Sequence, residues 1–452
     1  MNQELLYEYV KQLNTLYIGP ALVVILLGTG IFFTIRLGFV PRYICRTIRQ
    51  FLSEPHDHSK ASRGTGMSPL QALATSIASQ VGTGNIVGVA MALLMGGPGA
   101  LFWLWVSAIL GMSTNFAEAI LGQAYKTKTA DGHIVGGPAF YIHAGLHSRA
   151  LALLFSVFFI MALGMIGIMV QANSISASLV TLFPDSVQPW CIGIILAAFV
   201  GLVLSGGITR IASFAERVVP LMAGIFVVGC LIYIVMHIDG ILPVLGEVFC
   251  YAFTPKAGVG GAAGVAVMTA VRYGISRGLF SNEAGLGTTP HAHAIAKVQN
   301  SHEQGMMAIV GIAVDLIVCT FTGLVLLLSG VIDLPVHLVG IQLVQTAFAG
   351  SFGSIGTWFI AVSLFFFAMS SIVGWYFFAA QNVRYLFGEK PIIAYRVLVM
   401  MLVVLASVVE VPLIWELADT FNFFIVIPNV IALLWLSPQV VEQAKRMKRK
   451  SS

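Results

Sequence analysis

Ser79-Gln80-Val81-Gly82-Thr83-Gly84-Asn85 is a polar, glycine-bearing stretch inside a segment that is otherwise apolar enough to cross a membrane. The second half of the chain holds another such stretch, Ser276-Arg277-Gly278-Leu279-Phe280-Ser281-Asn282-Glu283. A helix opened inside a bilayer leaves backbone N–H and C=O groups that lipid cannot satisfy, so such breaks occur where they line a cavity. Paired breaks in the two halves of a chain are typical of the binding site of a secondary transporter.

The composition indicates a membrane protein. Of the 452 residues, 58% are hydrophobic and only 10% are charged, and the mean hydropathy is +0.91. A soluble domain carries about a quarter charged residues. A membrane-spanning helix takes about 20 apolar residues. We therefore expect an all-α polytopic membrane protein with eleven transmembrane helices, near residues 17–35, 68–95, 98–124, 150–182, 189–207, 213–236, 262–292, 305–330, 356–387, 393–410 and 417–437.

The net charge of +5 is a signal of membrane topology and not of nucleic-acid binding. When the N-terminus is placed outside, nearly all lysine and arginine residues fall in the inner loops or in the tail, and Lys11 and Lys256 are left outside. This bias predicts an external N-terminus and a cytoplasmic C-terminus in the plasma membrane, as in a bacterial inner membrane. The acidic start, with Glu4, favours an uncleaved helix over a signal peptide.

The chain is predicted to contain two repeats and no soluble domain. We expect residues 1–67 to form an extra N-terminal transmembrane helix and a cytoplasmic loop. Five-helix repeats over 68–237 and 238–437 follow, and then a basic cytoplasmic tail over 438–452. The breaks fall in the first and the sixth of the ten helices that follow the N-terminal one, and this odd offset of five gives the repeats opposite membrane orientations, as in inverted-repeat transporters. The segment from Asp333 to about Phe348 is predicted to be a helix on the outer surface.

The sequence gives no sign of an enzyme or of a resident cofactor. Its five cysteines are scattered and form neither a disulfide framework nor a zinc motif. The pairs His56/His58 and His291/His293 are predicted to be solvated loop histidines at the inner face. The sequence contains no triad order, Walker loop or dinucleotide motif. We therefore expect no catalysis, no organic cofactor, no nucleic acid and no obligatory protein partner.

The first break offers groups for both a carboxylate and a cation. Gly82 and Gly84 expose the backbone to a small ligand. The half-helix that begins near Asn85 presents free N–H groups and a positive dipole end, which suit a carboxylate. The carbonyl groups near Ala78 and Val81 end the preceding half-helix, and their negative dipole end suits a hard cation such as sodium.

Polar side chains accompany this backbone opening. Gln80, Thr83 and Asn85 are predicted to contribute to a substrate site, because polar clusters inside a membrane are usually functional. The alternative is a small-residue packing face of the form Gly84-xxx-Gly88. Packing alone does not explain the three polar side chains, so we favour the site.

The second break carries ionisable groups. Arg277 and Glu283 either form a buried ion pair that holds the broken helix in shape, or Arg277 binds a substrate carboxylate; we favour the ion pair. Phe280 is predicted to form an apolar wall of the pocket. Ser281 and Asn282 are predicted to form its polar edge.

Further polar residues lie inside other spans. The hydroxyl groups of Ser370 and Ser371 either complete a sodium shell with the carbonyl groups of the first break or bond back within their own helix. The spacing does not decide between these two. Glu118 and Asp315 either carry a coupling proton or are structural acids, and we favour the structural role.

At these residues the chain resembles the alanine or glycine:cation symporters, also called sodium:alanine symporters. The resemblance covers about residues 68 to 437. Its most specific stretches run from Ala74 to Ile86, from Gly96 to Trp105 and from Ser276 to Gly285. Ile427-Pro428-Asn429 is a further stretch that is similar to the family.

The resemblance implies a LeuT-type core of five plus five inverted helices behind one extra helix. It implies import of a small neutral amino acid, alanine or glycine first, together with sodium by alternating access. The glycine turn would hold the substrate carboxylate, and Asn85 would join a sodium site. A second sodium site would use the carbonyl groups at Ala78 and Val81 and the hydroxyl groups of Ser370 and Ser371.

Trp375 matches the family tryptophan expected near the substrate pocket. The residues that follow depart from the family, because Tyr376-Phe377-Phe378-Ala379-Ala380 replaces a Ser-Tyr-Tyr-Gly-Glu-like run and lacks its acid. This departure puts the substrate and the coupling ion in question. The alternative is a proton-coupled amino-acid carrier that uses Glu118, Asp315 or Glu283.

Overall fold

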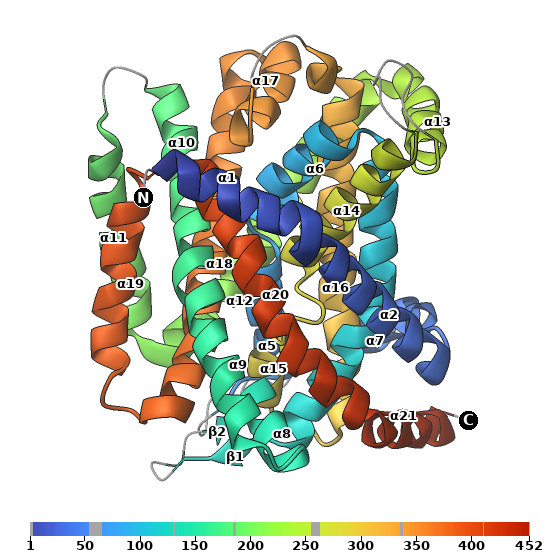
Figure 1. The fold of residues 1–452 in the computed structure, drawn as a ribbon, viewed down its shortest axis with the longest axis vertical. Coiled ribbons are helices and arrows are strands. Elements are labelled where there is room, and N and C mark those ends of the chain that lie inside the picture. Colours follow the sequence, from blue (N-terminus) through green and yellow to red (C-terminus); the bar gives the residue numbers. More distant parts are fainter. Residues whose placement is uncertain are drawn as a thin grey trace.

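The computed structural model describes residues 3–53, 66–129, 132, 134–183, 187–254, 263–334, 338–409 and 411–451. These residues form a bundle of helices with one small antiparallel hairpin, β1 (Thr127–Lys128) and β2 (Ile134–Val135). Most of the long helices run roughly along one direction of the molecule (Figure 1). The prediction of an all-α polytopic membrane protein is confirmed.

The helices follow one another along the whole chain. In chain order they are α1 (Gln3–Leu13), η1 (Asn14–Ile18), α2 (Gly19–Leu37), η2 (Val40–Tyr43), α3 (Ile44–Ser53), α5 (Pro69–Gln80), η3 (Gly84–Gly88), α6 (Val89–Gly96), α7 (Gly99–Ala124), α8 (Pro138–Gly145), α9 (Arg149–Met161), η4 (Ala162–Gly167), α10 (Ile168–Leu182), α11 (Pro189–Ser205), α12 (Gly207–Met236), η5 (Ile238–Gly240), α13 (Ile241–Tyr251), α14 (Ala263–Asn282), α15 (Pro290–Ala294), α16 (Ser301–Leu328), η6 (Val331–Asp333), α17 (Ile341–Phe352), α18 (Ser354–Phe387), α19 (Ile392–Ala406), α20 (Val411–Trp435) and α21 (Ser437–Ser451).

Within the described residues, seven helices are long and apolar enough to cross a membrane. The bent pair Pro69–Gln80 and Gly84–Gly96 makes an eighth span if it is counted as one. The shorter apolar helices α11 and α19, together with α14, would complete the expected set. The number of eleven therefore stays a prediction, as does the division into repeats over 68–237 and 238–437.

The first span begins earlier than the apolar pattern indicates. We predicted a helix over 17–35, whereas helix runs through η1 from Glu4 to Leu37. The extra turns pack against α20, and the two helices cross in Figure 1. Asn14 Nδ2 donates to the Glu416 carboxylate at 2.7 Å and to its backbone carbonyl at 2.8 Å. This polar contact between distant segments is not visible in a hydropathy pattern.

The first predicted break is present. Helix α5 begins with a capping box, in which the Ser68 hydroxyl accepts from the Gln71 N–H while the Gln71 side chain accepts from the Ser68 N–H. The helix ends at Gln80 because Val81 adopts an extended conformation with φ −86° and ψ 92°. The chain resumes as η3 and α6 after a bend of 46°.

The second predicted break is also present. Helix α14 ends at Asn282, and Glu283 takes a left-handed conformation with φ 57°. Gly285 and Gly287 also have positive φ values, of 92° and 73°, which glycine adopts without steric cost. Helix α15 restarts the chain with Pro290 in its first turn. Residues 283–289 are thus non-helical within the bundle.

The two ends of the bundle differ. Helix α17 lies at the upper end in Figure 1, whereas α8, the hairpin and α21 lie at the lower end. Helix α17 covers part of the segment predicted as a surface helix near 333–348, and residues 335–337 of that segment lie outside the described residues. The N-terminus lies toward the upper end and the C-terminus at the lower end (Figure 1).

Candidate functional site

The two breaks lie side by side at the centre of the bundle, where α14 packs against η3 and α6. Gln80 Nε2 donates to the backbone carbonyl of Asn282 at 2.8 Å. A Cβ on Gly84 would lie 3.1 Å from the Cα of Ser281 and 3.3 Å from Cδ1 of Phe280. The predicted residues of both breaks therefore share one buried site.

Two backbone N–H groups of the first break point at oxygen acceptors. The Gly82 N–H donates to Asn85 Oδ1 at 2.9 Å, and the Thr83 N–H donates to Gln171 Oε1 at 3.0 Å. The Thr83 hydroxyl is buried and has no hydrogen-bond partner among the described residues. A carboxylate that displaced these side-chain oxygens would meet adjacent N–H donors, which is the chemistry of an anion site.

Gln171 is a site residue that our sequence reasoning missed. It lies on α10, 1% exposed, and its Nε2 would be 3.2 Å from a Cβ on Gly82. The sequence does mark Gln171 as a candidate, because it is a polar residue inside the apolar segment predicted over 150–182. Nothing in the sequence indicated which of the several polar residues on this helix faces the break.

The cation groups predicted for the first break also meet. Ser371 Oγ donates to the carbonyl groups of Ala78, at 3.2 Å, and Ser79, at 3.1 Å. Ser370 Oγ bonds to the carbonyl three residues earlier in its own helix at 2.8 Å, and the Val81 carbonyl lies 3.5 Å away. The two open interpretations thus apply to different serines: Ser371 bridges to the break, and Ser370 bonds mainly within its own helix.

The first break and helix α18 lie very close to each other at the predicted cation site. A Cβ on Gly82 would lie 2.2 Å from Ser371 Oγ, and a Cβ on Gly374 would lie 3.1 Å from the Cβ of Ser79. Glycine at both positions lets α18 meet the end of α5. Carbonyl and hydroxyl oxygens at the negative end of a helix form a donor set that suits a hard cation.

Asp315 of α16 lies against the same break. Asn85 Nδ2 donates to Asp315 Oδ1 at 2.6 Å, and the Ser281 hydroxyl donates to the same oxygen. The other oxygen, Oδ2, is buried without a hydrogen-bond partner in the described part of the chain. Cys319 Sγ lies 3.1 Å from Ser281 Oγ. The site therefore contains a carboxylate that touches both broken helices.

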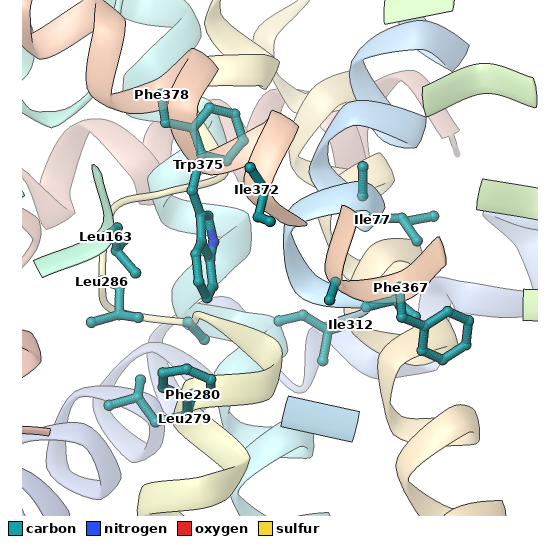
Figure 2. Packing of buried hydrophobic residues seen from close by; sticks show 14 of the residues in the cluster. Ile77, Leu163, Leu279, Phe280, Leu286, Ile312, Phe367, Ile372, Trp375 and Phe378 are labelled. Carbon is teal, nitrogen blue, oxygen red and sulfur yellow. The ribbon is translucent and has the colours of Figure 1, made fainter. Parts of the chain in front are cut away.

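Glu283 connects the first break to Trp375. The Trp375 indole Nε1 donates to Glu283 Oε1, and Ser79 Oγ donates to Glu283 Oε2 at 3.0 Å. The indole also meets the Phe280 ring edge to face at a centroid distance of 5.8 Å. Figure 2 shows the indole pointing toward Phe280, with Leu163 on one side.

The predicted ion pair between Arg277 and Glu283 is wrong. Arg277 pairs with Asp419 of α20, with Nη2 2.8 Å from Oδ2 and Nη1 3.1 Å from Oδ1. Helix α14 ends between the two residues of the predicted pair. The left-handed turn at Glu283 sends its carboxylate toward Ser79 and Trp375 instead. Because its guanidinium is engaged by Asp419, Arg277 is also not directed at the turn of the first break.

The prediction of solvated histidines at 291 and 293 is also wrong. Both side chains are buried, because α15 packs between α7 and α5. His291 Nε2 lies 2.9 Å from Nδ2 of Asn382, and His293 Nδ1 lies 2.7 Å from Oε1 of Gln304. No group of three or more His, Cys, Asp or Glu residues that could hold a metal is found in the part of the chain that the structure describes. His56 and His58 lie outside that part.

Glu118 of α7 is hydrogen-bonded to the second break. Its Oε1 accepts from the Gly287 N–H at 3.0 Å and from Asn429 Nδ2 at 2.6 Å. Asn429 Nδ2 also donates to the Gly285 carbonyl at 2.9 Å, and the Tyr141 hydroxyl donates to Asn429 Oδ1. Glu118 Oε2 is buried without a described hydrogen-bond partner. The network satisfies backbone groups that the break leaves open.

Known structures identify the architecture as that of LeuT-type transporters. The chain is similar to MhsT, solved in complex with L-phenylalanine, with a TM-score of 0.60 at 14% identity. The similarity covers 83% of this chain and 90% of that chain. The chain therefore has the fold of this class of proteins, with two broken helices, and the expected fold class is confirmed.

The chain belongs to the sodium:alanine symporter family, whose family model matches residues 3–452. It is 38% identical to the sodium/alanine symporter AgcS of Methanococcus maripaludis, over 96% of each chain. It is 36% identical to a Bacillus subtilis protein named "Probable sodium/glutamine symporter GlnT", over 98% of this chain and 91% of that one. The expected family is confirmed, and with it a multi-pass membrane protein of amino-acid:cation symport.

Proposed function

We propose that the protein imports a small neutral amino acid, alanine or glycine first, together with sodium. One observation carries the proposal: the Ser371 hydroxyl bonds to the Ala78 and Ser79 carbonyl groups directly beside the turn of the first break. This arrangement joins oxygen ligands for a hard cation to adjacent N–H donors for a carboxylate. A zwitterionic amino acid and sodium suit such a site together.

The substrate would bind between the two breaks. The residues proposed to contact it are Gln80, Gly82, Thr83, Gly84, Asn85, Phe280, Ser281, Asn282 and Trp375. Gln171, which accepts from the Thr83 N–H, joins them on the geometry. The relatives named for alanine and for glutamine support an amino-acid substrate without deciding its size.

Sodium is proposed to bind at Ala78, Val81, Ser370, Ser371 and Asn85. Asp315 would add a charged oxygen beside Asn85, because its Oδ2 is buried and otherwise without a hydrogen-bond partner in the described chain. Sodium here is cargo that moves with the amino acid. The chain would act as a carrier and not as an enzyme, and it would require no organic cofactor, nucleic acid or obligatory protein partner.

Transport would proceed by alternating access. The site residues of both breaks are buried in this structure, so release to either side requires the bundle to open. Sodium couples if it stabilises the state that binds the amino acid, and reciprocity then requires that the amino acid tighten sodium binding by the same factor. The termini lie toward opposite ends of the bundle (Figure 1), and the distribution of lysine and arginine residues favours an external N-terminus and a cytoplasmic C-terminus.

The test is uptake of labelled alanine by proteoliposomes that contain the purified protein. We expect an inward sodium gradient to drive accumulation, and a proton gradient in sodium-free buffer to drive none. Removal of sodium should lower alanine affinity in equilibrium binding, and removal of alanine should lower sodium affinity equally. Accumulation that is independent of sodium would overturn the proposal.

Proton-coupled amino-acid transport is a second candidate. The observation that favours it is the presence of buried carboxylates at the breaks, of which Asp315 and Glu118 each have one oxygen without a described hydrogen-bond partner. Among the described residues, no basic side chain forms an ion pair with Glu118, Asp315 or Glu283. The proton gradient in the same experiment distinguishes the two candidates.

A further inference from the structure

We propose that Glu283 is a positioning residue that limits the size of the amino acid accepted by the site. It would do so by fixing the indole of Trp375 as one wall of the substrate pocket. The proposal rests on the proposed function and specifies its substrate class: neutral amino acids whose side chain is no larger than that of alanine or serine.

The backbone conformation of Glu283 indicates that its side chain has a functional role. Its φ of 57° lies in the left-handed region, which side chains disfavour and glycine tolerates. Two glycines with positive φ follow within four residues, yet position 283 retains a carboxylate. A non-glycine residue held in this conformation is a sound basis for a functional hypothesis.

The Glu283 carboxylate accepts hydrogen bonds from two neutral donors, and no cation among the described residues forms an ion pair with it. Trp375 Nε1 donates to Oε1, and Ser79 Oγ donates to Oε2. The Glu283 side chain is fully buried, and the charged residue nearest in the same stretch, Arg277, is paired with Asp419 instead. The carboxylate therefore acts on the position of the indole and on the end of α5, and not in an ion pair.

The indole cannot move away from the pocket on its far side. A Cβ on Gly167 would lie 2.9 Å from Cζ3 of Trp375, so the ring packs directly on the bare backbone of η4. On the near side the ring meets Phe280, whose own ring lies against Gly84 of the first break. Figure 2 shows the indole directed toward the Phe280 ring.

Substrate size follows from this arrangement. An amino acid bound at Gly82–Gly84 would direct its side chain toward the Phe280 and Trp375 rings. A longer side chain requires the indole to rotate, and rotation breaks the hydrogen bond to Glu283 inside a buried site. Small side chains leave the bond intact. The departure from the family run after Trp375 does not touch this bond, because both partners are present in this chain.

The experiment measures selectivity in sodium-driven uptake by proteoliposomes. Unlabelled glycine, alanine, glutamine and leucine compete with labelled alanine, and the readout is the ratio of the inhibition constants for alanine and leucine. Glu283→Gly should shift this ratio toward leucine by about tenfold, the value of one buried hydrogen bond. Glycine is chosen because it adopts the left-handed conformation without strain. Glu283→Gln should keep the wild-type ratio, because an amide oxygen still accepts from an indole N–H.

A second variant tests the bond from its other end. Trp375→Phe keeps an aromatic ring but removes the donor, so it should relax selectivity as Glu283→Gly does. The double variant should be no more relaxed than either single variant. Trp103→Phe is the matched control, because its indole donates to the Ala252 carbonyl, which belongs to neither break, at 3.0 Å. Size-exclusion profiles check that each variant is folded.

The outcomes separate this proposal from the proposed function. Intact uptake with an unchanged ratio in Glu283→Gly and Trp375→Phe overturns the positioning role alone. If Glu283→Gln relaxes the selectivity as fully as Glu283→Gly does, the positioning role is also overturned, because the charge and not the hydrogen bond would then control selectivity. A wild-type protein that takes up no amino acid under any gradient overturns the proposed function, and this proposal with it.

Discussion

Arg277 and Asp419 form a two-point ion pair that joins α14 to α20, with N–O distances of 2.8 and 3.1 Å. Their side chains are 6% and 16% exposed. The guanidinium also lies over the Trp415 ring at 5.0 Å, and that ring meets Phe280 at 4.9 Å. The pair therefore anchors the second broken helix directly behind a wall of the proposed pocket.

Removal of one partner of this pair should destabilise the protein strongly. Arg277→Gln leaves the Asp419 carboxylate buried without its cation, which typically costs about 3–5 kcal/mol. We expect a clear drop in the melting temperature of the purified protein in detergent. Arg384→Gln is the matched control: Arg384 also pairs with a carboxylate at 2.8 Å, but its partner Glu389 is 39% exposed. Such a surface pair contributes about 1 kcal/mol or less.

The two variants also test the alternative that Arg277 binds the carboxylate of the substrate. If Arg277→Gln melted like Arg384→Gln and lost only alanine affinity, the guanidinium would act on the substrate and not on the fold. Asp419→Asn should destabilise the protein as well. The double variant Arg277→Gln/Asp419→Asn should be less destabilised than the sum of the two single variants, because neither charge is then left unpaired.

The ion pair also illustrates what sequence reasoning could and could not predict. Both breaks were predictable, because an apolar segment with glycines and polar residues at its centre has few structural solutions in lipid. The partner of Arg277 was not, since Asp419 lies 142 residues further along the chain. Proximity in sequence favours Glu283 as the partner, but the left-handed turn after Asn282 directs its carboxylate elsewhere.

The same limit applies to the rest of the site. Asn85, Ser281 and Ser371 could be nominated from the sequence, because polar groups inside spans are rare and usually functional. Gln171 and Asp315 are also polar residues inside predicted spans, but their position beside the first break depends on the packing of helices distant in sequence. The buried state of His291 was missed for a similar reason, because short helices such as α15 carry no clear burial pattern of their own.

Gly84 should tolerate no side chain. A Cβ there would lie 3.1 Å from the Ser281 backbone and 3.3 Å from the Phe280 ring, so Gly84→Val must push the two broken helices apart. We expect loss of alanine binding while the protein still inserts into the membrane. Gly88→Ala is the control, because a Cβ at Gly88 would meet nothing closer than 3.9 Å. Equilibrium binding of alanine to both purified variants checks this, and wild-type affinity in Gly84→Val would remove Gly84 from the site.

Ser371→Ala should weaken the response to sodium more than the choice of substrate. The variant removes the hydroxyl that reaches the Ala78 and Ser79 carbonyl groups. The sodium concentration for half-maximal alanine uptake should rise about tenfold, in line with the loss of one hydroxyl ligand. The preference for alanine over glycine should stay as in the wild type. Ser363→Ala on the same helix, two turns away from the break, is the control. An unchanged sodium response in Ser371→Ala would exclude this hydroxyl as a ligand.

Asp315→Asn separates sodium coupling from proton coupling. Asp315 Oδ1 accepts from Asn85 and Ser281, and an asparagine in its place can keep one oxygen acceptor while it removes the charge. If Asp315 contributes a charged ligand to sodium, the variant should need more sodium for uptake, because a hard cation loses an anionic oxygen. If Asp315 carries the coupling proton, the variant should lose proton-driven accumulation and keep only exchange of alanine across the membrane.

Asp239→Asn in η5, which lies outside both breaks, should behave as the wild type in both assays. Sodium-driven uptake with wild-type sodium dependence in Asp315→Asn would leave this carboxylate only a structural role at the breaks.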